Sequence, residues 1–360
     1  MFNKKFLFIA MLIVAIVAVG SVSAADDVAI DIDEPADDIA VDEIAIEDDS
    51  ADETDEIVET EQATVSYDVD ENTTSIQDVI NTEETNSHIV SFKPIQYNLT
   101  NALTIHGNVT LYGNGATLVG SGNNIFDIAG ASNFTITGFN IITNSTKAAF
   151  YGANVEDATI CYNNITGGKD GINIMQTYKN INITGNRIDG VTRDAISLVD
   201  HETDGANGFD FSTWDSSIVA NNIITGAASY GTEYGMFFGG NFKGNITGNV
   251  ITGVATGIEF AGKKAVTNGK LCVKFNDNNI TGVKNGVNMY HPNVICFNVT
   301  NCNILLSYPY AISSNYGAIN TNGYFNATGY IGVYNSNFRG KISDDFKSAA
   351  GNNTANNTGF

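Results

Sequence analysis

Apolar residues recur at short, regular intervals through most of this sequence, with polar residues between them. Between residues 158 and 175, the segments "ATICY", "NITG" and "GINIM" each alternate apolar and polar positions. Such alternation is typical of half-buried β-strands, and the segments are too short for helices. It places Ile160, Ile165, Ile172 and Ile174 on one side of the chain. The pattern therefore predicts three short strands that turn their apolar faces to a common core.

The same three-strand unit repeats along the chain. Aligned on the first Asn of the pattern N-x-I-x-G, the copies begin at Asn140, Asn163, Asn186, Asn222, Asn249 and Asn278, with separations of 23, 23, 36, 27 and 29 residues. Weaker copies follow near Asn303 and Ser336. Repeats of this kind bury their apolar faces by stacking on one another. We therefore predict an all-β protein, a parallel β-helix with one coil per repeat, in which the aligned asparagines form a ladder at one tight turn.

The two ends of the repeat region differ from its middle. In "TTSIQDVINTEE", Thr and Ser precede Ile76, Val79 and Ile80, which have helical spacing. This predicts a short capping helix that covers the first coil. The predicted β-helix domain comprises residues 63–345, and we expect the Asn- and Thr-rich residues 346–360 to be a disordered tail.

Charge and hydropathy distinguish the N-terminal segments. Lys4 and Lys5 precede an apolar run and the small residues of "GSVSAADD", which predicts a signal peptide over residues 1–25; an uncleaved anchor is the alternative. Between Asp26 and Glu61 there are 18 acidic residues and no Lys or Arg, so we predict a disordered acidic spacer at residues 26–62. The remainder carries 22 acidic and 15 basic residues, a balance that gives no indication of nucleic acid as a partner.

The four cysteines match no metal-binding spacing. Cys161 lies in an apolar segment and is interpreted as a small core residue. Cys272 and Cys296 fall at similar phases of neighbouring repeats, so the sequence permits a disulfide between them without requiring one.

The segment "SIQDVINTEETNSHIVSFKPIQYNLTNALTIHGNVTLYGNGATL", followed by Asn-rich coils such as "NNITG", resembles right-handed parallel β-helix proteins of the pectin-lyase-like superfamily. Within that superfamily, the sequence is most similar to adhesin-like surface proteins of methanogenic archaea. The resemblance extends from about Thr74 to Gly340. It implies the fold, but the superfamily includes lyases, glycosidases and adhesins, so the choice among these activities depends on individual residues.

The resemblance implies one catalytic hypothesis. Polygalacturonase-type hydrolases carry acids on consecutive coils just before the third strand, where "GKDGINI" and "TRDAISL" place Asp170 and Asp194. Paired carboxylates can share the acid and base roles at a glycosidic bond. The sequence departs from the family pattern, with Arg193 in place of a second acid, Tyr234 in place of His, and Glu259 where a basic residue is expected. Alternatively, Asp-Gly and Asp-Ala are turn-forming pairs that bond their own backbone.

Two further sets of residues could bind a ligand. Lys169, Arg193 and Lys284 share a column just before the third strand, where they could contact anionic sugars. The longest insertion, residues 199–217, contains side chains suited to stacking on sugars, namely His201, Phe209, Phe211 and Trp214. It also contains a candidate Ca²⁺ site made of Asp200, Glu202, Asp204 and Asp210. The alternatives are a solvated face for the cations and an ordinary loop that packs its aromatic side chains on the coils.

Glycosylation is also expected of an exported chain with this sequence. The acceptor pattern Asn-x-Thr/Ser occurs 13 times, and the sites that we expect to be used are Asn98, Asn108, Asn133, Asn144 and Asn326.

From the sequence we favour a secreted or cell-surface, non-catalytic β-helix protein for adhesion or carbohydrate binding. The alternative is a polysaccharide hydrolase or lyase that uses Asp170 and Asp194 as its acids. The expected partner is a cell-surface glycan or polysaccharide. We expect a monomer with no nucleic acid partner, no membrane span in the mature chain, and no cofactor other than Ca²⁺ on the loop.

Overall fold

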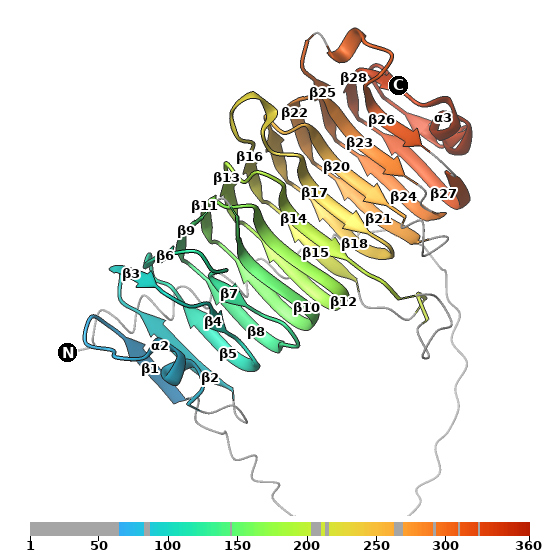
Figure 1. Ribbon diagram of the computed structural model, residues 1–360. Helices are drawn as coiled ribbons and strands as arrows, with labels where there is room; N and C mark the ends of the chain where they lie inside the picture. Colours follow the sequence, from blue (N-terminus) through green and yellow to red (C-terminus); the bar gives the residue numbers. More distant parts are fainter. Residues whose placement is uncertain are drawn as a thin grey trace, which may run out of the picture. The chain divides into compact units, whose positions relative to one another are not determined.

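The computed structural model describes residues 65–82, 87–144, 146–202, 210–212, 216–262, 269–290, 293–308, 310–322 and 325–360. The predicted signal peptide and acidic spacer lie outside these residues. The described residues are mostly β-strands, which form one sheet of 10 strands and one of 20 strands (Figure 1).

The 10-stranded sheet contains β3 (Gln96–Leu99), β6 (Thr117–Gly120), β9 (Asn140–Thr143), β11 (Asn164–Gly167), β13 (Arg187–Asp189), β16 (Ile223–Thr225), β19 (Val250–Thr252), β22 (Asn279–Val283), β25 (Asn303–Leu306) and β28 (Asn337–Arg339). The 20-stranded sheet contains β1 (Val65–Val69), β2 (His88–Phe92), β4 (Leu103–Thr104), β5 (Gly107–Tyr112), β7 (Phe126–Asp127), β8 (Ser132–Thr137), β10 (Ala148–Cys161), β12 (Asp170–Thr184), β14 (Asp194–Val199), β15 (Ser217–Ala220), β17 (Tyr234–Gly239), β18 (Phe242–Thr247), β20 (Thr256–Ala261), β21 (Lys270–Asn276), β23 (Asn285–Tyr290), β24 (Asn293–Thr300), β26 (Gly317–Asn322), β27 (Asn326–Tyr334), β29 (Lys341–Ile342) and β30 (Thr354–Ala355).

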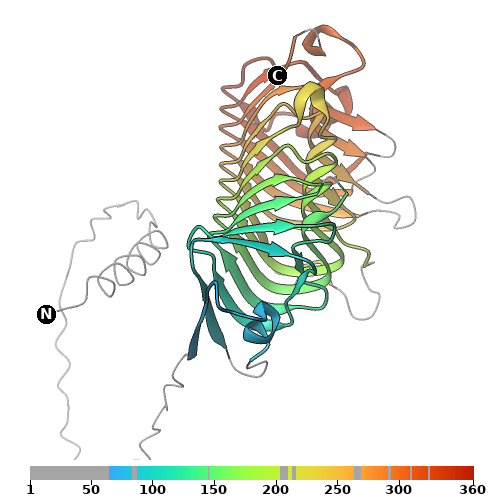
Figure 2. The same cartoon turned by 60° about the vertical axis from the view of Figure 1, so that its left-hand side comes forward.

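Each coil contributes one strand to the smaller sheet and two to the larger one. β11 pairs with β13 of the next coil, whereas the long strand β12 pairs first with β14 and then with β15. These pairings are parallel, and Figure 2 shows the strands stacked coil upon coil. Since connections between parallel strands of one sheet are right-handed, the fold is a right-handed parallel β-helix. The predicted fold class is confirmed.

The predicted asparagine ladder forms at the turn before each strand of the smaller sheet. Asn163, Asn186, Asn222, Asn249 and Asn278 are at most 1% exposed. The side-chain oxygen of Asn222 accepts hydrogen bonds from the backbone N–H and the side-chain amide of Asn186, at 2.9 and 3.1 Å. Its own amide donates to Ile183 O and to Asn249 Oδ1, at 2.9 and 3.0 Å. The ladder therefore satisfies buried backbone groups at a turn where no sheet partner exists.

In the first copy of the repeat, the ladder position lies one residue before the Asn that the sequence pattern indicates. Asn140 pairs with Asn164, so it does not belong to the ladder. The ladder position of that coil is Phe139, whose N–H donates to the side-chain oxygen of Asn163 at 3.0 Å. Beyond Asn278, the ladder positions are taken by Cys302, Ser336 and Asn357.

Short helices lie at both ends of the described coils. In α2 (Ile76–Ile80), the Ser75 side chain caps the N-terminus by accepting a hydrogen bond from the Asp78 N–H at 3.2 Å, as the sequence predicts. The prediction of a disordered C-terminal tail is wrong. Ser343 caps helix α3 (Asp344–Ala350), whose Phe346 is fully buried, and β30 then pairs with β27. The buried side chain of Phe346 anchors this segment to the core, and the Asn- and Thr-rich sequence after it gives no sign of that contact.

The structure also settles the cysteine pairing. Cys272 and Cys296 are directly opposite each other on β21 and β24 and form a disulfide, with Cα atoms 4.4 Å apart. Cys161 and Cys302 are free. No helix among the described residues is long and apolar enough to cross a membrane.

Candidate functional site

The two predicted acids occupy equivalent positions on neighbouring coils. Ile172 pairs with Ile196, and Asp170 and Asp194 lie two residues before them at the starts of β12 and β14. Tyr234, the first residue of β17, pairs with Asp194 and continues the column. The frame of the repeat therefore places these three side chains in adjacent coils, about 5 Å apart along the stack.

Small residues after these positions let the coils approach closely. A Cβ on Gly171 would press on the backbone oxygen of Ala195, and a Cβ on Gly235 would press on that of Gly257. This explains why Gly follows Asp170 and Tyr234, whereas the coil accommodates the small Cβ of Ala195 after Asp194.

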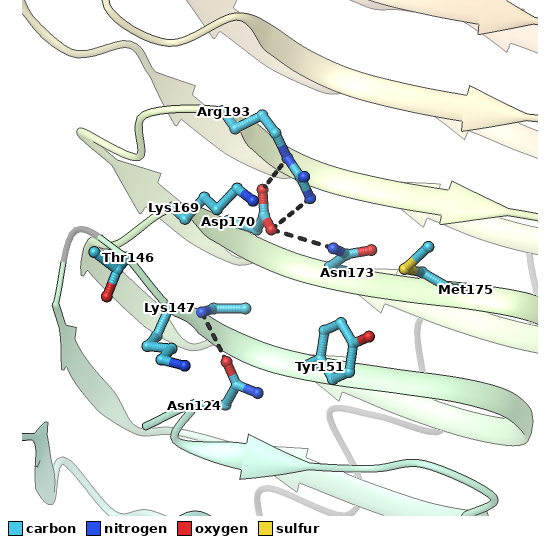
Figure 3. A pocket seen from close by; sticks show the side chains of 10 residues that line it. Asn124, Thr146, Lys147, Tyr151, Lys169, Asp170, Asn173, Met175 and Arg193 are labelled. Atoms are coloured by element: carbon cyan, nitrogen blue, oxygen red, sulfur yellow. Dashed lines mark hydrogen bonds and ion pairs between the residues drawn. The ribbon is translucent and has the colours of Figure 1, made fainter. Parts of the chain in front are cut away.

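Asp170 is held in place by an unusually complete set of donors. Arg193 donates from Nε to its Oδ1 at 2.8 Å and from Nη2 to its Oδ2 at 2.7 Å, as Figure 3 shows. Asn173 Nδ2 donates at 3.1 Å and the backbone N–H of Asp194 at 3.3 Å. Such a two-pronged, charge-assisted pair fixes both groups. With its oxygens occupied, Asp170 orients Arg193 and is poorly placed to act as a free acid.

Asp194 has a different environment. Its Oδ2 lies 3.3 Å from Arg193 Nε, but its buried Oδ1 has no hydrogen-bond partner within the described part of the chain. Burial raises the pKa of Asp194 to about 7; Arg193 opposes this shift, and the nearby Asp170 and Glu233 add to it. A carboxyl group with a pKa near neutrality and a free oxygen has the properties of a general acid or base.

Further titratable groups follow on the next coils. Burial, with Glu259 and Glu233 nearby, raises the pKa of the Tyr234 hydroxyl well above its usual range. Burial also raises the pKa of Glu259 to about 7, although Asn288 Nδ2 donates to its Oε2 at 2.6 Å. Tyr234 and Glu259 stand at positions that the sequence comparison treated as departures from a hydrolase pattern, and Glu233 was not proposed as a site residue. For Tyr234 and Glu233 the signal that could have identified them is their position in or beside the column of Asp194, whereas Glu259 aligns with Phe237, three residues farther along the strand.

Two adjoining hollows lie over the starts of these strands, and we call them together the groove. One, of about 420 Å³, is lined by Lys147, Lys169 and Asp170, among others (Figure 3); the second, of about 320 Å³, is lined by Asp194, His201, Glu233, Tyr234 and Phe237, among others. Asn173, Met175 and Arg193 line both. Neither Lys147 nor Lys169 forms an ion pair with another described residue. The groove is therefore cationic at one end and acidic at the other.

The predicted ligand-binding residues of the long insertion divide into three groups. His201 lines the groove. Phe211 is only 5% exposed, and Lys270 Nζ lies 6.0 Å from its ring centre, so the prediction that it presents a ring to a ligand is wrong. Phe209 and Trp214 lie outside the described residues.

The predicted calcium ligands are partly described. Asp200 is fully buried; its Oδ2 accepts from Asn241 Nδ2 at 2.7 Å and its Oδ1 from the Glu202 N–H at 3.2 Å. Asp210 accepts hydrogen bonds from the backbone and hydroxyl of Ser212, and Asp204 lies outside the described residues. Among the described residues there is no group of three or more His, Cys, Asp or Glu side chains that could hold a metal ion. Calcium binding stays a prediction.

The predicted glycosylation sites lie at the surface. Asn98, Asn133, Asn144 and Asn326 are exposed, and Asn108 is half-buried. Asn108 and Asn133 stack at one left-handed turn, where Asn133 Nδ2 donates to Asn108 Oδ1 at 2.9 Å. Their modification stays a prediction.

No protein-family model and no curated protein matches this sequence. Solved structures do match. The A-module of the mannuronan C-5 epimerase AlgE6 from Azotobacter vinelandii has a TM-score of 0.52 and 12% identity, over 79% of this chain and 93% of that module. The AlgE4 A-module from the same organism has a TM-score of 0.47 and 14% identity, over 72% of this chain and 87% of that module. The catalytic unit of the GH87 α-1,3-glucanase from Streptomyces thermodiastaticus has a TM-score of 0.45 and 14% identity, over 77% of this chain and 63% of that unit.

At this identity, the likeness to the AlgE6 module shows the fold alone. This chain is a parallel β-helix of the same architecture. None of these matches supports the narrower resemblance to adhesin-like archaeal proteins, which stays a prediction.

Proposed function

We propose that this protein binds a polysaccharide along the groove. The observation that carries the proposal is the arrangement of Lys147 and Lys169, two ammonium groups with no ion pair to any described residue, beside the fixed Arg193–Asp170 pair. Adjacent coils repeat these polar positions about every 5 Å, so they present an elongated row to an extended polymer. Rigid coils supply such a site without the entropic cost of ordering loops.

The charges favour an acidic glycan at the Lys147 end of the groove. Each exposed ammonium adds a modest, salt-dependent attraction for a sugar carboxylate. The AlgE6 module is named for mannuronan, a polymer of uronic acid units, and this makes mannuronan a reasonable first ligand to test.

Adhesion and export belong to the same proposal. The predicted signal peptide and acceptor asparagines favour a secreted or cell-surface protein that holds a surface glycan. The groove gives that interpretation a specific binding face.

The binding test compares the purified protein with the double variant Lys147→Ala, Lys169→Ala by titration calorimetry with mannuronan and with neutral dextran. We expect tighter binding of mannuronan than of dextran, and about a tenfold loss in the variant from roughly 1.4 kcal/mol of lost attraction. The matched control is Lys274→Ala, an exposed lysine on β21. Equal mannuronan affinities of the double variant and the protein would refute the proposal.

A second candidate function is a proton-transfer reaction on the bound glycan, and Asp194 favours it. Its buried carboxyl group, whose Oδ1 has no hydrogen-bond partner among the described residues and whose pKa is about 7, lines the groove beside Tyr234. In this hypothesis, Asp194 exchanges the proton, and Asp170 positions Arg193.

The catalytic test incubates mannuronan with the protein and follows both chain length and sugar composition. Activity that Asp194→Asn abolishes, and that Lys274→Ala retains, would support catalysis. If neither chain length nor composition changes with the unaltered protein, the enzyme hypothesis fails and the binding proposal stands on its own titration.

A further inference from the structure

A second cluster of side chains lies farther along the same edge of the coils. It joins the 3₁₀ turns η2 (Ala228–Tyr230) and η3 (Tyr310–Ile312), which follow β16 and β25. These strands are three coils apart, yet the turns touch. The rings of Tyr230 and Tyr310 lie 5.7 Å apart, edge to face, and the Tyr230 hydroxyl donates to Ser307 Oγ at 2.8 Å. The contact forms a bridge over the intervening coils.

A cation is held within this bridge. Lys284 Nζ lies 4.8 Å from the ring centre of Tyr230 and 5.7 Å from that of Tyr310. Both distances allow attraction between the ammonium group and the faces of the rings. Tyr316 also packs edge to face on Tyr310, with ring centres 4.9 Å apart, so Tyr310 is held by two aromatic neighbours.

The backbone of η2 contains two residues in the left-handed conformation. Ser229 and Tyr230 are consecutive non-glycine residues, each with a φ of 59°, in the left-handed region that a Cβ disfavours. Strain of this kind persists where the surroundings fix a particular side chain, and it is concentrated at functional sites. Here a residue in that conformation, Tyr230, is the one whose ring lies over Lys284.

The outer surface of the cluster is apolar and exposed. Tyr308 is 75% exposed and Ile312 is 70% exposed, the two largest values among the exposed large hydrophobic side chains described. They flank the partly buried Tyr310. An exposed ring two residues from a fixed tyrosine is typical of a recognition surface rather than of packing.

The cluster continues the edge on which the groove lies. The backbone N–H of Lys284 donates to Ala255 O, and that of Ala255 donates to Thr232 O, next to Glu233 of the groove. Lys284 therefore stands two coils beyond Glu233, about 10 Å along the stack. In Figure 1, η2 projects beyond β16, at the edge of the coils where β17 begins.

We propose that Tyr308, Ile312, Lys284 and the tyrosines that fix it form a second sugar-binding subsite, the tyrosine platform, for the same acidic polysaccharide that occupies the groove. Tyr308 stacks on the apolar face of a sugar ring, and Lys284 attracts its carboxylate. The proposal rests on the proposed function, because the shared edge is the reason to expect one polymer at both places. It predicts that long chains bind more tightly than short ones.

The experiment measures the affinities of the protein for a mannuronate trisaccharide and for polymeric mannuronan. Tyr308→Ala, alone and with Ile312→Ser, should weaken polymer binding about tenfold and leave trisaccharide binding unchanged. Tyr112→Ala, which removes an exposed tyrosine from β5, is the matched control and should change neither affinity. Circular dichroism verifies that each variant is folded.

The outcomes separate the platform from the groove. If polymer affinity is unchanged in the Tyr308 variants, or if the protein does not bind mannuronan at all, the platform proposal is overturned. If Tyr308→Ala weakens polymer binding while Lys147→Ala with Lys169→Ala has no effect on either ligand, the platform binds and the groove does not. The alternative occupant of this surface is a second copy of the protein, and light scattering tests it by measuring the molar mass. If the protein is a dimer and Tyr308→Ala is a monomer, the surface binds a second copy and the platform proposal is overturned.

Discussion

Replacing Asp194 with Asn is expected to stabilise the protein at alkaline pH and to destabilise it modestly in acid. The folded-state pKa of Asp194 is about 7, against 3.8 for an ordinary Asp, because the carboxyl group is buried. The folded state therefore binds more protons than the unfolded state between these pH values. Proton binding by Asp194 therefore contributes to the free energy of unfolding in full below pH 4, and this contribution is lost as the pH rises through 7.

The magnitude follows from the shift. About three pKa units correspond to roughly 4 kcal/mol of destabilisation once Asp194 is ionised, at about 1.4 kcal/mol per unit. An asparagine carries no charge, but it leaves a buried amide group without a partner, which offsets about 1–2 kcal/mol. We expect a net gain of about 2 kcal/mol above pH 8 and, because only the amide penalty remains when Asp194 is protonated, a loss of about 1–2 kcal/mol at pH 4.

Asp170→Asn is the control with the opposite sign. This substitution removes a two-pronged ion pair at 2.7 and 2.8 Å and leaves the guanidinium of Arg193 without its main partner. We expect a loss of about 2 kcal/mol at neutral pH, since Arg193 is partly exposed and regains solvent. Two carboxyl groups on successive coils should therefore respond oppositely to the same isosteric change.

The assay is urea denaturation followed by far-ultraviolet circular dichroism between pH 4 and 9. Glu259, whose pKa is also raised to about 7, contributes a similar decline to both proteins, so the difference between Asp194→Asn and the unaltered protein isolates Asp194. A variant that is equally stable or less stable than the protein at pH 9 would refute the reasoning, and so would a gain that does not depend on pH.

Two further predictions concern the coils. Asn222→Ala should cost about 3 kcal/mol, because it removes a fully buried side chain that makes four hydrogen bonds, whereas Asn164→Ala, which loses one exposed hydrogen bond, should cost less than about 1 kcal/mol; equal losses in urea denaturation would contradict the importance of the ladder. Reducing the Cys272–Cys296 disulfide, which closes a loop of 24 residues, should lower the free energy of unfolding by about 3 kcal/mol, and an unchanged midpoint with dithiothreitol would contradict this.

The repeat was predictable because it follows directly from stacking. A side chain that serves the coil, such as Asn186 or Asn249, has the same neighbours in every copy and therefore recurs in the sequence. Where a different residue type fits the same position of the coil, the asparagine does not recur and the sequence pattern is lost. Phe139 and Cys302 occupy ladder positions without being asparagine, and for this reason the alignment was one residue out in the first copy.

The candidate site was predictable only in part. The repeat brought Asp170 and Asp194 together, but the pairing of Arg193 with Asp170 depends on side-chain conformations that no spacing reveals. The burial of Phe211 was equally hidden, since the sequence of a loop does not show which face it packs. The contact between Tyr230 and Tyr310 joins residues three coils apart, so no local pattern predicts it.

Stacked coils also impose a general electrostatic constraint on any site built from one column. Two carboxylates on neighbouring coils, about 5 Å apart, repel by roughly 3 kcal/mol at an effective dielectric constant near 20. Such a column needs a cation between the acids or a proton on one of them. This chain uses both means, since Arg193 neutralises Asp170 and the raised pKa of Asp194 keeps a proton available there near neutral pH. Arg193 makes two short hydrogen bonds to Asp170 and only a longer contact, at 3.3 Å, to Asp194, so the burial of Asp194 is compensated less completely than that of Asp170.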